Sequence, residues 1–116
     1  MSVVRWQVVY FVDERGKSPV EEWAISLTVK ERATFVKKVE MLKVFGTTLK
    51  EPHAKHVSGK LWELRYTHNK RAFRVFYFNP IRNEIVLLHA IVKTTNKLPR
   101  HAVEIALKRL DDYLRR

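Results

Sequence analysis

The sequence predicts an α+β domain in which helices pack against an antiparallel sheet. Between residues 61 and 93, three apolar segments follow one another with short polar turns between them, a pattern typical of an antiparallel meander. On either side of this region, apolar residues recur every three or four positions, as they do on one face of a helix. With 116 residues and 46% hydrophobic content, the chain is expected to form one domain over residues 1–116.

The N-terminal region predicts a strand followed by a short helix. Residues 5–12 are rich in β-branched and aromatic side chains, which favour a strand. Ser18 is a suitable N-cap, Pro19 suits the first helical position, and Glu21 completes the spacing of a capping box. A helix is therefore expected to begin at this point.

A second helix is expected to follow almost at once. Thr28 and Glu31 repeat the spacing of a capping box, and Gly46 is a natural helix end. The apolar stripe of this helix consists of Phe35, Val39, Leu42 and Phe45. Since the two helices have almost no loop between them, they should form a hairpin.

The C-terminal half predicts three strands and one more helix. Residues 47–60 look irregular, and strands are expected at 61–67, 72–79 and 84–93. Pro99 opens the last helix. The expected architecture places helices on one face of the sheet and leaves the other face partly open.

Composition limits the possible functions. The formal net charge is +11, from 23 lysines and arginines against 12 acids, which predicts an anionic partner such as nucleic acid or an acidic protein. Cysteine is absent, which excludes disulfides and thiolate zinc sites and suits a cytoplasmic location. The N-terminal residues do not have the layout of a signal peptide, and no apolar run is long enough for a membrane span. A membrane partner is therefore not expected.

Four residues with basic side chains stand within the three strands predicted between residues 61 and 93: Arg65, Arg74, His89 and Lys93. Arg74 is the most unusual of them, because it lies between Phe73 and Val75 in an otherwise apolar segment. Side chains alternate between the two faces of a strand, so His89 and Lys93 share a face. Cations held on a rigid sheet are suited to binding a polyanion.

The ordered motifs LWELR, RVFYF and IVLLHAIVKTTNKLPRHAVEIALKR resemble the RelE/ParE superfamily of toxins from type II toxin–antitoxin pairs. The HigB-like, phage-derived branch is the most similar. The resemblance covers nearly the whole chain and implies a RelE-like α+β fold. It also implies an endoribonuclease that cuts mRNA on the ribosome without a metal or any other cofactor. The implied partners are mRNA, the ribosome and a cognate antitoxin, a small helix-turn-helix protein encoded nearby.

The resemblance also implies which residues form the site. By position, Arg65 and Arg74 match the arginines that hold the scissile phosphate, and Lys93 matches a basic position at the end of the last strand. HigB-like members use histidine for proton transfer, which points to His89 as the fourth catalytic residue. The residues expected to bind RNA are Lys55, His56, Lys60, Lys70, Arg71, Tyr77 and Lys97.

The chemistry of such a site requires little from the protein. In metal-free RNA cleavage the 2′-hydroxyl attacks the adjacent phosphate, so the protein must orient the backbone, neutralise developing charge and move two protons. Arginine suits the charge and histidine the protons. The sequence contains no HExxH motif or acidic cluster, and no metal site is expected.

Each of these residues also has a structural interpretation. Arg65 could form a surface ion pair with Glu63 or Asp111, and His89 could be a buried core residue. Trp62 is expected in the core, and Tyr77 is the better candidate for stacking on a base. Two other functions remain open: a ParE-like topoisomerase inhibitor without enzymatic activity, and a nucleic-acid-binding module that is not toxic.

Overall fold

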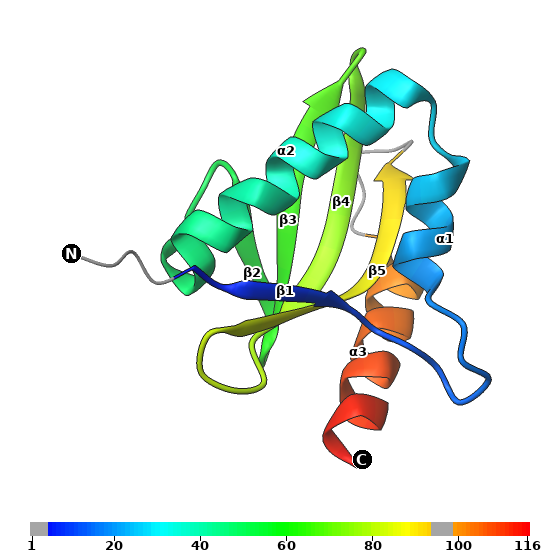
Figure 1. The fold of residues 1–116 in the computed structure, drawn as a ribbon, viewed down its shortest axis with the longest axis vertical. Coiled ribbons are helices and arrows are strands. Elements are labelled where there is room, and N and C mark those ends of the chain that lie inside the picture. The colour runs from blue at the N-terminus through cyan, green and yellow to red at the C-terminus, as the bar shows by residue number, and fades with distance from the viewer. Residues whose placement is uncertain (1–4, 94–98) are drawn as a thin grey trace.

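The computed structural model describes residues 5–93 and 99–116. These residues form a mixed sheet with three α-helices (Figure 1). In chain order the elements are β1 (Gln7–Tyr10), α1 (Pro19–Ser26), α2 (Val29–Phe45), the 3₁₀ turn η1 (Gly46–Thr48), β2 (Ala54–Ser58), β3 (Leu61–His68), β4 (Arg71–Phe78), β5 (Glu84–Lys93) and α3 (Arg100–Leu114).

The sheet has the strand order β1-β5-β4-β3-β2. β1 runs parallel to β5, and the other neighbours are antiparallel. The predicted α+β class and meander are confirmed. The prediction of an irregular segment at 47–60 is wrong over Ala54–Ser58, which forms the edge strand β2. β2 is short, mostly exposed and polar, so it has little of the alternating apolar pattern by which strands are recognised.

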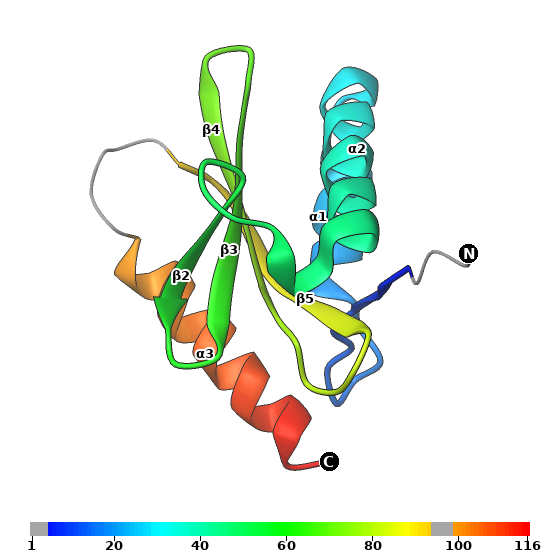
Figure 2. The same cartoon turned by 90° about the vertical axis from the view of Figure 1, so that its left-hand side faces the viewer.

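Helices pack on both faces of the sheet. Figure 2 shows α1 and α2 on one side of the sheet and α3 on the other, where no described helix lies over the end next to the β3–β4 turn. The second face is therefore partly open, as expected. The amphipathic helix α3 packs its Ala102, Ala106 and Leu110 against the rest of that face. Their partners there include Phe76 and Leu88. Between the two helical layers, β4 and β5 are buried on both sides, which explains their almost continuous apolar sequences.

Two apolar clusters stabilise the two faces. The cluster beneath α1 and α2 contains Phe35, Leu42 and Phe73, and the cluster beneath α3 contains Phe76 and Phe78. Alternation along the strands assigns each side chain to one of these faces. The predicted stripe of α2 is correct except at its end, where Phe45 is 49% exposed.

Only one of the two predicted capping boxes forms. At the start of α2, Thr28 Oγ1 accepts from the Glu31 N–H at 3.2 Å, and Glu31 Oε1 accepts from the Thr28 N–H at 2.9 Å. Ser18 makes no such bond: its hydroxyl is buried and has no hydrogen-bond partner among the described residues. Pro19 favours the helix start without a side-chain cap, because its ring fixes a helical φ and it has no N–H that needs an acceptor.

The β3–β4 hairpin sets the register on which the site depends. Asn69 and Lys70 form its two-residue turn, with φ of 52° and 65°, the left-handed conformation that such turns require. This register places Arg65 opposite Arg74. The predicted polar turn and strand pairing at this point are confirmed.

We predict that Gly46→Ala strongly destabilises the fold. Gly46 ends α2 at φ 52°, and a Cβ there would lie 1.9 Å from an atom of the Trp6 indole. The cost should exceed the roughly 1–2 kcal/mol of a left-handed alanine, because the indole must also move. Urea unfolding would measure it. Gly59→Ala is the matched control, since Gly59 has the same φ but open space around it. Equal losses of stability in the two variants would contradict this account.

Candidate phosphate-binding site

Two arginines and a glutamate meet on the face of the sheet against which α3 packs. Arg65 on β3 lies opposite Arg74 on β4. Arg74 is only 8% exposed, and Glu63, which is 7% exposed, provides the negative charge. Glu63 Oε1 lies 3.5 Å from Arg65 Nε and 3.9 Å from Arg74 Nε. The ion pair expected in the structural interpretation of Arg65 is therefore present, and it forms one cluster with the second arginine.

The cluster keeps an excess of positive charge. Burial lowers the pKa of Arg74, and the nearby Arg65 lowers it further, whereas Glu63 acts in the opposite direction. One carboxylate faces two guanidinium groups, both of which remain protonated at neutral pH. Arg74 Nη1 also donates to the Phe73 carbonyl at 2.8 Å, which fixes the plane of the guanidinium. The group is thus held in position before any anion arrives.

The two arginines line one open cavity of about 370 Å³. The turn before β2 supplies another wall of this cavity, with Pro52 and His53. The His53 carbonyl accepts from the Arg65 N–H at 2.8 Å, so this turn is held against β3. His53 is half-buried and was not predicted as a site residue, because its segment looked irregular. Its position beside Arg65 results from the pairing of β2 with β3, which the spacing of residues in the sequence does not indicate.

His89 and Lys93 lie on the same face as Arg74. Ile91 is directly opposite Arg74, and His89 and Lys93 occupy the two diagonal positions on β5. Diagonal neighbours across antiparallel strands are about 7–8 Å apart, within reach of long side chains. Neither residue lines the 370 Å³ cavity. The register therefore brings the four predicted catalytic residues to one region, with the two arginines at its centre.

The chemical state of His89 is set by Arg109 on α3. Arg109 Nη1 donates to the Leu88 carbonyl at 2.9 Å and lies 3.1 Å from His89 Nδ1. Since arginine can only donate, Nδ1 accepts, and the imidazole proton lies on Nε2. Burial, Arg109 and His101 together lower the pKa of His89 to about 4. His89 is therefore neutral near pH 7, and its Nε2 offers a hydrogen-bond donor.

Four of the residues predicted to bind RNA lie near the start of β3. His56 and Tyr77 flank Trp62 on the neighbouring strands, and Lys55 and Lys60 line cavities beside it. Tyr77 is only 3% exposed, and burial raises its pKa to about 12. Burial leaves little of this ring exposed, although it lines the smaller of these cavities, so the stacking role of Tyr77 stays a prediction. Trp62, which was expected in the core, is half-buried and lines two cavities.

Two more predicted RNA-binding residues, Lys70 and Arg71, lie at the β3–β4 turn, at the other end of β3 from Trp62. Lys70 is exposed in the β3–β4 turn. Arg71 Nη1 lies 3.0 Å from Glu31 Oε2, so it ties this hairpin to α2. Lys97 lies outside the described residues, and its role stays a prediction.

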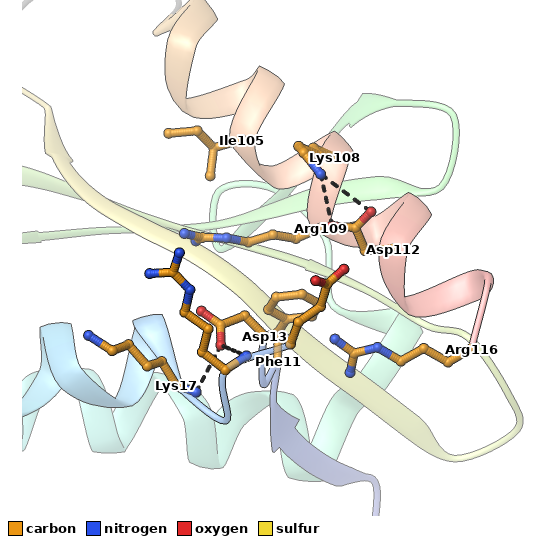
Figure 3. Close-up of a pocket in the computed structure, with 10 residues that line it drawn as sticks. Phe11, Asp13, Lys17, Ile105, Lys108, Arg109, Asp112 and Arg116 are labelled. Atoms are coloured by element: carbon orange, nitrogen blue, oxygen red, sulfur yellow. Dashed lines mark hydrogen bonds and ion pairs between the residues drawn. The ribbon is translucent and has the colours of Figure 1, made fainter.

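A second cavity, of about 480 Å³, lies between α3 and the β1–α1 loop (Figure 3). Phe11 forms its floor, and the Arg116 guanidinium lies 5.0 Å from the centre of that ring. Asp13 accepts from two backbone N–H groups of its own loop, which lowers its pKa. Lys108 pairs with Asp112 at 3.1 Å. Lys108 and Asp112 are thus paired with each other, and Asp13 is held by the backbone of its own loop.

Two kinds of site are not seen in the part of the chain that the structure describes. Its histidines and carboxylates include no group of three or more that could hold a metal ion. None of its helices is long and apolar enough to cross a membrane.

The fold and the paired arginines define a small, basic α+β protein with two adjacent arginines on one face of its sheet. The family model described as "Phage derived protein Gp49-like (DUF891)" matches residues 22–111, and the chain belongs to this family. The matched region begins within α1 and ends within α3, so it contains all the residues of the arginine cluster. No curated protein matches the chain significantly.

We predict that His89 titrates near pH 4 and makes the fold less stable in acid. Its pKa is about 4 in the fold against 6.5 for a free imidazole, so between these values the unfolded chain binds a proton that the folded chain does not. Stability from this source is complete above pH 6.5 and is lost as the pH falls towards 4. An NMR titration of the imidazole would give the pKa. Unfolding at pH 7 and pH 4.5 should show a smaller pH effect in His89→Gln than in the wild type. A measured pKa of 6 or higher for His89 would contradict its burial beside Arg109.

Proposed function

We propose that this protein is a metal-independent mRNA endonuclease that acts on the ribosome, the toxin of a type II toxin–antitoxin pair. The observation that carries the proposal is the pair Arg65 and Arg74, held opposite each other and open to one cavity. Two guanidinium groups in a fixed position suit a phosphodiester, because each can donate two parallel hydrogen bonds to its oxygens. Membership of the phage-derived Gp49-like family and the resemblance to RelE/ParE toxins support this choice.

In the proposed reaction the ribose 2′-oxygen attacks the adjacent phosphorus, and the bond from phosphorus to the 5′-oxygen breaks. The products are a 2′,3′-cyclic phosphate and a free 5′-hydroxyl. Arg65 and Arg74 neutralise the charge that develops on the non-bridging oxygens. The two arginine side chains need not move during the reaction. Glu63 already holds both guanidinium groups, and the Phe73 carbonyl holds that of Arg74.

The proton of the 2′-hydroxyl needs an acceptor, and His53 is the residue we assign to this role. It shares the cavity with both arginines and is connected to Arg65 through the backbone. His89 suits the role less well, since its Nδ1 faces Arg109 and its Nε2 carries the proton. We assign to His89 a hydrogen bond from Nε2 to a phosphate oxygen. Lys93 lies on the same face and can protonate the leaving 5′-oxygen.

The partners of the proposed activity are mRNA, the ribosome and a neutralising antitoxin. A net charge of +11 suits both the ribosome, which is rich in phosphate, and an acidic antitoxin segment. A small helix-turn-helix protein encoded beside this chain is the expected antitoxin.

We predict that Arg74→Lys lowers cleavage of translated mRNA by roughly 100- to 1,000-fold, the usual effect of removing one donor to a developing oxyanion. Lysine keeps the charge but loses the planar fork that Phe73 and Glu63 orient. Primer extension on mRNA from cells expressing each variant would measure the cleavage. Arg82→Ala, at an exposed turn position, is the matched control and should leave cleavage unchanged.

The same expression experiment separates the proposed function from the alternatives. If the cells stop growing with intact mRNA and an SOS response, topoisomerase inhibition replaces the proposed nuclease function. Harmless accumulation of the wild-type protein without an antitoxin would refute both toxin functions. Unchanged cleavage by folded Arg74→Lys would remove Arg74 from the mechanism.

We predict that His53→Gln loses most cleavage without losing RNA affinity, because glutamine keeps the polarity but cannot accept the proton. Single-turnover cleavage and RNA binding, measured on the same preparation, would separate the two effects. General bases contribute typically 100- to 10,000-fold, so the expected loss lies in that range. A folded His53→Gln variant with wild-type cleavage would exclude His53 as the acceptor.

A further inference from the structure

Trp62 stands at the centre of a second group of cations, on the sheet face opposite to Arg65. It lies near the start of β3 and packs partly against the cluster beneath α1 and α2. The rest of its side chain forms a shared wall of two cavities, of about 190 and 460 Å³. An indole that only filled the core would be enclosed by other side chains and would not line two cavities.

The surroundings of Trp62 combine aromatic rings with positive charge. Lys50 Nζ lies 5.5 Å from the centre of the indole, and the His56 ring meets it edge-on at 5.3 Å. His56 Nε2 donates to the Gly59 carbonyl at 2.7 Å, which fixes this ring. Lys60 lines the smaller cavity. Aromatic faces between cations are the usual means of binding single-stranded nucleic acid, in which bases stack and phosphates meet lysines.

The smaller cavity has the dimensions and walls for one planar group. Its volume of about 190 Å³ is below the roughly 300–1,000 Å³ of cavities that bind drug-sized ligands. Trp62 and Tyr77 give it aromatic walls, and Lys60 and Asn79 give it polar ones. A single base could enter it and stack on the indole while its phosphate meets Lys60.

The smaller cavity is also close enough to the arginine site for one RNA strand to reach both. The larger cavity beside Trp62 is lined by Lys50 and Glu51, and the arginine cavity by Pro52 and His53, so one short turn separates them. Trp62 and Arg65 are three residues apart on β3, about 10 Å along the strand. A flexible single strand can pass this turn at the open edge of the sheet, where β2 is the last strand.

We propose that Trp62 is a base-stacking subsite for single-stranded RNA, which holds a nucleotide a few positions away from the phosphate at Arg65 and Arg74. The choice of RNA rests on the proposed function. Lys50, Lys55 and Lys60 contact the backbone around the stacked base. The subsite would add affinity with little dependence on sequence, since every base has an aromatic face.

The test uses a 2′-O-methyl RNA 12-mer, which cannot be cleaved, and an abasic strand of the same length. Binding is followed by fluorescence anisotropy and by tryptophan fluorescence. The compared proteins are the wild type, Trp62→Leu, which keeps an apolar contact, and Trp62→Phe, which keeps a ring. Circular dichroism checks that each variant is folded. Trp23→Phe is the control for the fluorescence change, because Trp23 packs against Phe35 and Phe73 in the core.

We expect the RNA to quench wild-type fluorescence and Trp23→Phe fluorescence, with the quenching lost in Trp62→Phe. Trp62→Leu should bind the RNA about 5- to 100-fold more weakly, and Trp62→Phe should keep most of the affinity. The abasic strand should bind all three proteins equally weakly. Equal RNA affinity in the wild type and a folded Trp62→Leu, or equal wild-type affinity for both strands, would overturn the subsite.

The outcome is independent of cleavage. If the wild type quenches and binds as expected but cuts no translated mRNA, the proposed nuclease function fails and the stacking subsite remains. If Arg74→Lys stops cleavage while Trp62→Leu changes neither affinity nor quenching, the subsite fails and the nuclease remains.

Discussion

The structure depends on one constraint: a guanidinium must be kept charged on a central strand of a sheet with helices on both faces. Arg74 is 8% exposed and lies between two fully buried neighbours, Phe73 and Val75. An unpaired buried charge costs several kcal/mol, so its surroundings must compensate. They do so through Glu63 on the adjacent strand, through the Phe73 carbonyl, and through a cavity by which the group reaches solvent. This arrangement depends on the register of the hairpin, which places Arg65 opposite Arg74, and on the turn before β2, which lines the cavity.

The helix α3 affects both the packing of one sheet face and the protonation of His89. It packs Ala106 and Leu110 against the aromatic cluster, on the sheet face where the arginines also lie. Through Arg109 it also holds His89 neutral, with the proton on Nε2. Without α3, His89 would be less buried and would ionise more easily. A partner that displaced this helix would therefore change the chemistry of the sheet face as well as its access.

Much of the fold could be predicted from the sequence because its signals are local. The Thr28 capping box, the end of α2 at Gly46 and the meander all follow from residue types at short spacing. Three features could not be predicted in this way. The edge strand β2 lacks apolar alternation, and the side of the sheet on which α3 packs depends on long-range contacts. The third is that Ser18 makes no side-chain cap, since its hydroxyl is buried with no hydrogen-bond partner among the described residues. The site divides likewise. The apolar setting of Arg74 and the family resemblance of Arg65 predict these two residues from sequence, whereas His53 and Trp62 acquire a role only through contacts between strands.

The central claim is that Arg65 and Arg74 together hold a phosphodiester. The most direct measurement is an NMR titration of the arginine Nε–Hε signals with a short 2′-O-methyl RNA. The account predicts that the Arg65 and Arg74 signals shift together and saturate at the same RNA concentration, while Arg116, in the cavity beside Phe11, changes little. RNA binding that leaves both the Arg65 and the Arg74 signals unchanged would contradict it.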